Sequence, residues 1–269
     1  MKGIIGAIIG SSIGLSYEIK KTKDYNFNLI YDKANPSDDS IAIIATADWL
    51  MNTNHTKDEY IDKLHDWCNK FNYGMWNYGL ATTFKEWIRE KKREPYNSFG
   101  NGSAMRVIPV GWYAKSLEEA TKLAKITAEV THNHPEGIKG AQCVAAVIYL
   151  IRQGESKTYI KKFVQNNFGY NLNISYKSLK ANHKFECTCQ NSVPASIICW
   201  LDSIDYMDCV RKAVSLGGDA DTEAAIAGAF AAADPHGAAD DEDFVQDVIR
   251  FFSMDFLDMY KKFHEKYEK

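Results

Sequence analysis

The chain has 269 residues, of which 45% are hydrophobic, and a formal net charge of −3. This length supports a sizeable core, and no linker-like, repetitive or low-complexity segment divides the chain, so we expect one domain spanning residues 1–269. The lack of a basic excess argues against general nucleic-acid binding, because no domain-wide positive field would attract phosphates. Six irregularly spaced cysteines are typical of reduced thiols in a cytoplasmic protein.

The first predicted element is the apolar, glycine-rich run 3–15, which follows Met1-Lys2 like the start of a signal peptide. Its glycines dilute the hydrophobicity, no small-residue cleavage site follows, and the run is too short to span a bilayer, so we expect neither a signal peptide nor a membrane partner. Glycines spaced three or four apart predict a buried helix packed closely against a neighbour. Glu18, just after the run, is either a surface acid or, beside a metal, a general base.

Helical patterns continue along the rest of the chain, and sustained two-residue alternation is scarce, so the sequence predicts an all-α protein. Two capping boxes, Thr56 with Glu59 and Ser116 with Glu119, each mark a helix start. Further helices are expected at about 40–52, 83–92, 104–114, 138–153, 158–167, 192–201, 206–216, 222–233 and 243–266. The acidic run 240–243 is interpreted as a solvated cap on the last of these helices.

Two acidic segments, Ser37–Ser40 and Gly217–Thr222, each lie at a predicted helix start. Either one alone is explained by helix capping. Together they contain more carboxylates than capping requires, and clustered carboxylates repel each other at low dielectric unless cations are present. If the fold brings the segments together, their oxygen ligands suit Mg²⁺ or Mn²⁺ better than zinc.

Two loops rich in small or polar residues precede other predicted helices. In Tyr96–Arg106 the small residues allow backbone N–H groups to approach a diphosphate, although a tight turn explains the pattern equally well. In this interpretation Arg106 braces a carboxylate inside the fold or contacts ligand. In Thr131–Gly137 two histidines lack a third zinc ligand, so we expect one to orient the loop or ligand and the other to be structural. Cys187-Thr188-Cys189 is likewise interpreted as an extended or irregular segment and not as a zinc site.

Taken together, these motifs resemble the ADP-ribosylglycohydrolase family, typified by the dinitrogenase-reductase-activating glycohydrolase. The family's motifs are matched in order and cover the chain as far as Ala233. The matching segments are 6–18, Ser37-Asp38-Asp39-Ser40, 95–111 (PYNSFGNGSAMRVIPVG), 131–142 (THNHPEGIKGAQ) and 216–228 (LGGDADTEAAIAG). The chain departs from the family pattern at Ser11, where an aspartate is common, and at Ser37, where a threonine is usual.

The resemblance implies a single-domain, all-α orthogonal helical bundle with two Mg²⁺ or Mn²⁺ ions at the base of a cleft. It implies hydrolysis of the bond at the ribose anomeric carbon of a mono-ADP-ribosylated protein or other acceptor, with Glu18 or Asp38 accepting a proton from water. The metal ligands carried over are Ser37, Asp38, Asp39, Asp219, Asp221 and Thr222. The substrate-binding residues carried over are Ser98, Phe99, Gly100, Asn101, Gly102, Ser103, Met105, His132 and Asn133.

Two other functions use the same residues. A silent module would bind ADP-ribose without turning it over, as the loss of a carboxylate at Ser11 suggests. A metal-dependent phosphohydrolase would use clustered aspartates and a phosphate loop for phosphoryl transfer, and would release phosphate. The acceptor depends on loops at the cleft mouth, such as 70–82 and 168–192, which the sequence does not place; the metal used and the oligomeric state are also left open.

Overall fold

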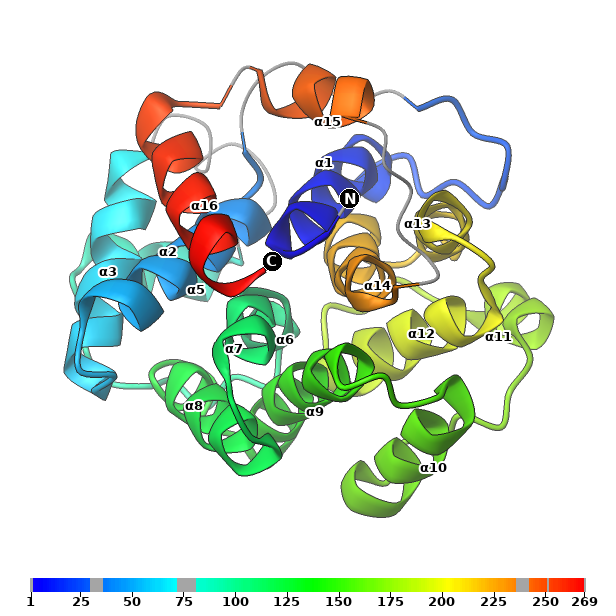
Figure 1. Cartoon of the computed structure of the whole chain (residues 1–269), viewed down its shortest axis with the longest axis horizontal. Helices are drawn as coiled ribbons and strands as arrows, with labels where there is room; N and C mark the ends of the chain where they lie inside the picture. Colours follow the sequence, from blue (N-terminus) through cyan, green and yellow to red (C-terminus); the bar gives the residue numbers. More distant parts are fainter. Residues whose placement is uncertain (1, 30–35, 72–80, 236–241, 251, 269) are drawn as a thin grey trace.

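The computed structural model describes residues 2–29, 36–71, 81–235, 242–250 and 252–268, and its ordered elements are helices (Figure 1). Within these ranges, paired extended backbone occurs only at an isolated bridge between Gly100 and Thr188. The all-α prediction is therefore confirmed.

The helices run through the whole chain and differ widely in length. They are α1 (Ile4–Glu18), α2 (Asp38–Asn52), α3 (Lys57–Lys70), α5 (Thr82–Arg89), α6 (Gly102–Arg106), α7 (Ile108–Tyr113), α8 (Leu117–Glu129), α9 (Pro135–Arg152), α10 (Lys157–Phe168), α11 (Tyr176–Asn182), α12 (Cys189–Asp202), α13 (Tyr206–Val214), α14 (Ala220–Ala233), α15 (Glu242–Ile249) and α16 (Met254–Tyr267).

The structure corrects three of the predicted elements. The predicted helix 104–114 is two short helices, α6 and α7, because Pro109 has no N–H to donate to the carbonyl four residues earlier. The predicted helix 243–266 is broken between α15 and α16, where Ser253 caps the second helix. Helix α11 was not predicted, since it is short and has no buried residue to create an apolar stripe.

The two predicted capping boxes form to different extents. At α3 the Thr56 side chain accepts a hydrogen bond from the backbone of Glu59, and the Glu59 carboxylate accepts one from the backbone of Thr56. At α8 Ser116 caps in the same way, but the carboxylate of Glu119 accepts from the backbone N–H of Lys115 instead. Both helices start where the sequence predicted.

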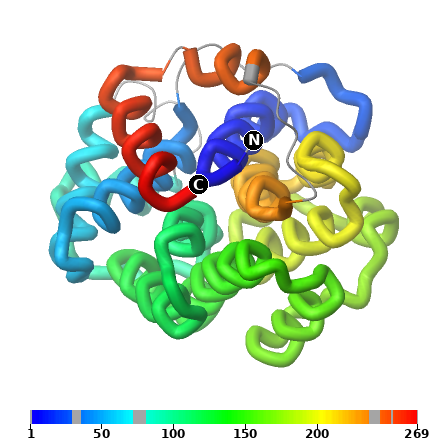
Figure 2. The backbone as a smooth tube through the Cα atoms, viewed as in Figure 1, coloured from blue at the N-terminus to red at the C-terminus, as the bar shows by residue number. Residues whose placement is uncertain are grey.

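Helices α1 and α14 pack along each other at the centre of the fold (Figure 2). A Cβ added at Gly10 would lie 2.2 Å from the carbonyl oxygen of Ala224, and one at Gly14 would lie 2.2 Å from that of Ala220. Only glycine allows this approach, which confirms the predicted close packing of the first helix. The contacts also show that the helices are antiparallel, so the end of α1 meets the start of α14. Glu18 is thereby brought to the second acidic segment.

The last described residues close the fold around α1. The buried carboxylate of Glu268 accepts a hydrogen bond from the backbone N–H of Ile4 (2.6 Å) and contacts Nδ1 of His264 (2.8 Å). These contacts hold α16 beside α1, and α16 also packs against α2. No helix in the described ranges has both the length and the apolarity needed to cross a bilayer. Asp240 and Asp241 of the predicted acidic cap lie outside the described residues.

Candidate functional site

A cavity of about 490 Å³ opens where α1, α2, α6 and α14 converge. It brings together residues from each of the five segments that resemble the family. The predicted site residues that line it are Glu18, Asp38, Asp39, Ser98, Phe99, Gly100, Asn101, Gly102, Met105, His132, Asp219, Asp221 and Thr222. The cavity has an acidic end and a glycine-rich end, and the two differ in their chemistry.

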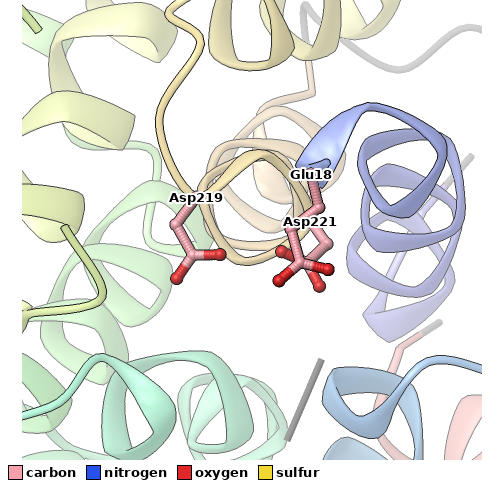
Figure 3. A group of neighbouring side chains, drawn as sticks. All are labelled: Glu18, Asp219 and Asp221. Atoms are coloured by element: carbon pink, nitrogen blue, oxygen red, sulfur yellow. The ribbon is translucent and has the colours of Figure 1, made fainter. Parts of the chain in front are cut away.

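The acidic centre, defined as Glu18, Asp38, Asp39, Asp219 and Asp221, consists of two overlapping groups of carboxylates. In one group an oxygen from each of Glu18, Asp219 and Asp221 lies within 4.8 Å of the others; in the second the same holds for Asp38, Asp39 and Asp221. Figure 3 shows the carboxylates of the first group facing one space, with Glu18 at the end of α1 and the two aspartates at the start of α14. Asp221 belongs to both groups and connects them.

At the start of α2 the hydroxyl of Ser37 caps the helix, accepting from the backbone N–H of Ser40 (3.1 Å). The carboxylates of Asp38 and Asp39 are therefore not needed as caps. Ser11 donates to Oδ2 of Asp39 (3.0 Å), and its oxygen lies 2.6 Å from the Ser37 hydroxyl. Ser11 thus supports Asp39 from α1, whereas Ser37 is buried beneath the carboxylates and is not among the residues that line the cavity.

At the start of α14 the capping pattern is different. Asp219 occupies the N-cap position but makes no side-chain capping bond. Its Oδ2 instead accepts a hydrogen bond from Nδ2 of Asn101 (2.7 Å). Thr222 donates from its hydroxyl to Oδ1 of Asp39 (3.4 Å), which links the two acidic segments directly. Asn101 was predicted to bind substrate, and its role as a support for Asp219 had no signal in the sequence.

Burial and mutual repulsion alter the acidity of the centre. Burial, followed by the charges of Asp219 and Glu18, raises the pKa of Asp38 to about 7. Burial and neighbouring carboxylates also raise the pKa values of Asp39 and Asp221 well above the usual range, and that of Glu18 above its ordinary value. Cations bound among these buried oxygen donors would offset the repulsion and favour the ionised carboxylates. The residues therefore fit hard divalent cations such as Mg²⁺ or Mn²⁺.

A buried pair of side chains, His183 and Glu223, supports the start of α14. Nε2 of His183 lies 2.6 Å from Oε1 of Glu223, and both side chains are almost fully buried. A Cβ at Gly218 would lie 2.5 Å from that imidazole nitrogen, so only glycine fits between this pair and Asp219. This contact joins helix α14 to the segment that follows α11.

At the other end of the cavity, residues 98–102 form a glycine loop around His132. A Cβ at Gly100 would lie 3.4 Å from Nε2 of His132, and one at Gly102 would lie 3.3 Å from it. Burial, with a contribution from the charge of Arg106, lowers the pKa of His132 well below its usual value, so the imidazole is neutral. His134 instead caps α9 by accepting from the backbone N–H of Glu136. His134 thus has the structural role expected for one of the two histidines, whereas His132 lines the cavity and its expected role toward a ligand stays a prediction.

Two of the predicted substrate residues do not line the cavity. Ser103 is fully buried, and its hydroxyl donates to the carbonyl of Gly137 (2.8 Å). The side chain of Asn133 accepts a hydrogen bond from the backbone N–H of Asn97 (2.8 Å). Both residues hold the glycine loop in place from outside the cavity.

Several cavity residues were missed or interpreted differently from the sequence, among them Arg106, Cys187 and Phe84. Arg106 lines the cavity, but its partners are a carbonyl and a hydroxyl and not the carboxylate considered from the sequence. Cys187 lines it as well, and burial and Asp219 raise the pKa of its thiol. Phe84 of α5 forms part of the wall. Of the two loops expected at the mouth, 168–192 therefore supplies Cys187, whereas residues 72–80 lie outside the described residues.

The sequence model of the ADP-ribosylglycohydrolase family matches residues 1–240, and the chain belongs to this family. Its relatives include human ADP-ribosylhydrolase ARH3, which is 23% identical over 86% of this chain and 83% of its own length. A putative ADP-ribosyl glycohydrolase, L543, of Acanthamoeba polyphaga mimivirus is 23% identical over 84% of both chains. A solved structure titled "ADP-ribosylglycohydrolase-related protein complex" superposes with a TM-score of 0.68 at 16% identity, covering 97% of this chain and 93% of that one. The fold is therefore that of the ADP-ribosylglycohydrolases.

Proposed function

We propose that this protein is a metal-dependent hydrolase that removes ADP-ribose from a mono-ADP-ribosylated acceptor by cleaving the bond at the ribose anomeric carbon. The observation that carries the proposal is one cavity with a buried acidic centre at one end and a glycine loop at the other. Membership of the ADP-ribosylglycohydrolase family and similarity to an ADP-ribosylhydrolase support it.

Two Mg²⁺ or Mn²⁺ ions are proposed to bind the acidic centre. Asp221 is suited to serve both, since it belongs to both carboxylate groups. The remaining proposed ligands are Ser37, Asp38, Asp39, Asp219 and Thr222. Bound there, the ions would lower the pKa of a coordinated water and orient the ribose hydroxyls. Ser37 would act as a ligand only through an oxygen lone pair that helix capping leaves free.

The carboxylates of the protein would then accept the proton of the water and stabilise the positive charge on the sugar. Glu18 is the proposed general base, because it lies at the edge of the acidic centre and its raised pKa makes it a better proton acceptor than an ordinary glutamate. Asp38 is the alternative base on the same grounds. Breaking the bond to the anomeric carbon develops positive charge on the sugar, and the surrounding carboxylates are suited to stabilise it.

The glycine loop is the proposed site for the diphosphate and ribose. Ser98, Gly100 and Gly102 leave room for ligand beside the neutral imidazole of His132, while the ring of Phe99 and the thioether of Met105 form the apolar part of the wall. Ser103 and Asn133 are proposed to act indirectly, through the hydrogen bonds that hold this loop.

The acceptor is a protein side chain or another ADP-ribosylated group. A cytoplasmic location is proposed because all six cysteines are free thiols in the structure.

The test is to incubate the purified protein with ADP-ribosylated arginine, serine and nucleic-acid substrates, with Mg²⁺, Mn²⁺ or EDTA, and to measure free ADP-ribose. Asp219→Asn is the active-site variant, and Asp66→Asn, on the exposed surface of α3, is the matched control. Release that requires metal and Asp219, but not Asp66, is the expected result, and the substrate that reacts identifies the acceptor. Release of phosphate would instead indicate a phosphohydrolase.

The second candidate is a binding module that holds ADP-ribose without hydrolysing it. The observation in its favour is Ser11, which contributes a hydroxyl to Asp39 where relatives commonly have a carboxylate. This candidate predicts ADP-ribose binding with no product from any of the substrates.

A further inference from the structure

A buried guanidinium lies under the glycine-loop end of the cavity. Arg106 is 1% exposed, and the described residues give it no carboxylate partner. Its Nη2 donates to the carbonyl of Thr127 (2.6 Å) and to the hydroxyl of Thr131 (2.7 Å), while its Nε has no partner. A buried charge without a counter-charge is costly, so its neighbours are expected to present their negative ends to it.

The hydroxyl of Thr131 contacts both Arg106 and His132, and therefore links the guanidinium to the imidazole. Arg106 can only donate, so one lone pair of the Thr131 hydroxyl is occupied. The same oxygen lies 2.7 Å from Nδ1 of His132. With one proton and one lone pair left, the Thr131 hydroxyl either donates to an unprotonated Nδ1 of His132 or accepts from an Nδ1–H group.

The charge of Arg106 decides between these two patterns. A proton on Nδ1 would direct the positive end of the imidazole dipole toward the guanidinium, which is unfavourable. A lone pair on Nδ1 points the negative end toward it and aligns the bonds from Arg106 through Thr131 to His132 in one direction, so that they strengthen each other. The neutral ring then carries its proton on Nε2, the nitrogen that faces Gly100 and Gly102.

We propose that Arg106 and Thr131 are positioning residues that hold neutral His132 in the Nε2–H tautomer, so that it donates a hydrogen bond to a diphosphate oxygen of the ligand at the glycine loop. The identity of the ligand rests on the proposed function, whereas the tautomer does not. An anion at this point would also provide a counter-charge for Arg106, which has no carboxylate partner among the described residues.

The tautomer is measured first, by NMR of the full chain labelled with ¹⁵N-histidine and without ligand. The expected spectrum shows Nε2 of His132 protonated and Nδ1 unprotonated. A proton on Nδ1, or a charged ring at neutral pH, would overturn the proposal. If the expected tautomer is found but wild-type protein does not bind ADP-ribose, the proposed function fails and the tautomer assignment stands.

The positioning role is measured by ADP-ribose affinity. Thr131→Val removes the hydroxyl at nearly constant shape and is expected to weaken binding about tenfold, whereas Thr131→Ser restores it to within about threefold. In a His132→Ala background, Thr131→Val should have no further effect, because Thr131 acts through His132. Mn²⁺ affinity, which reports on the acidic centre, should not change. Equal losses in both backgrounds, or no loss in either, would refute the positioning role.

Discussion

The two ends of the cavity differ in the sign of their buried charge. The acidic centre concentrates buried carboxylates, and burial together with the neighbouring carboxylates raises the pKa values of Asp38, Asp39 and Asp221. At the glycine-loop end a buried cation, Arg106, donates to a carbonyl and a hydroxyl and has no carboxylate partner among the described residues. One end is thus complementary to divalent cations and the other to a negatively charged ligand. The proposed ADP-ribosylated substrate, whose ribose would bind the cations and which carries a diphosphate, would match both ends at once.

The largest expected effect comes from the carboxylate shared by both groups. Asp221→Asn should lower turnover at least about a thousandfold and weaken Mn²⁺ binding, because it removes a ligand from each group. It should also stabilise the metal-free protein, since it relieves repulsion among buried acids. Turnover, Mn²⁺ titration and thermal unfolding in EDTA measure these effects. Full metal-dependent turnover by this variant would contradict the proposed use of the acidic centre.

Glu18→Gln separates catalysis from metal binding within the acidic centre. We expect turnover to fall about 10²- to 10⁴-fold through loss of the general base, with a smaller loss of Mn²⁺ affinity than for Asp221→Asn. Steady-state kinetics at saturating Mn²⁺ tests this. Nearly normal turnover would transfer the role of general base to Asp38.

The pH dependence of metal binding should follow the raised pKa of Asp38. Below about pH 7 protons compete with cations at this carboxyl, so Mn²⁺ affinity should fall by up to about tenfold per pH unit. Without metal, the effect of pH has the opposite sign. The pKa of Asp38 in the folded state lies above its unfolded value of about 3.9, so the contribution of this carboxyl to the free energy of unfolding is greatest below that pH and is lost as pH rises toward 7. Mn²⁺ titrations and unfolding in EDTA from pH 5 to 8 measure both trends. Metal affinity that does not change over this range would contradict the pKa.

The smallest effect is expected at the opposite end of the cavity. In Gly102→Ala the added Cβ would lie 3.3 Å from Nε2 of His132, which narrows the space beside the imidazole. ADP-ribose affinity should fall about threefold to tenfold, while Mn²⁺ affinity stays the same. Calorimetry with each ligand distinguishes the two ends. A parallel loss of both affinities would show that the ends are not independent.

The two acidic segments show which features of the site could be predicted from the sequence and which could not. Both were expected at helix starts and both are there, but capping explained them equally well in sequence. The structure separates the two explanations, since Ser37 caps α2 and frees its aspartates, whereas Asp219 is held by Asn101 and caps nothing. The helix breaks at Val107, between α6 and α7, and before Ser253 were missed because apolar periodicity continues across them.

By itself, the sequence determined the helical class, most helix starts, the close packing of the first helix and the two acidic segments, because periodicity, capping and glycine spacing act over a few residues. Only the tertiary structure decided that Asp221 joins both carboxylate groups, that Arg106 contacts Thr131, and that Cys187 enters the cavity. These contacts join residues far apart in the chain. Their energies depend on burial and on neighbouring charges, which exist only once the helices have packed together.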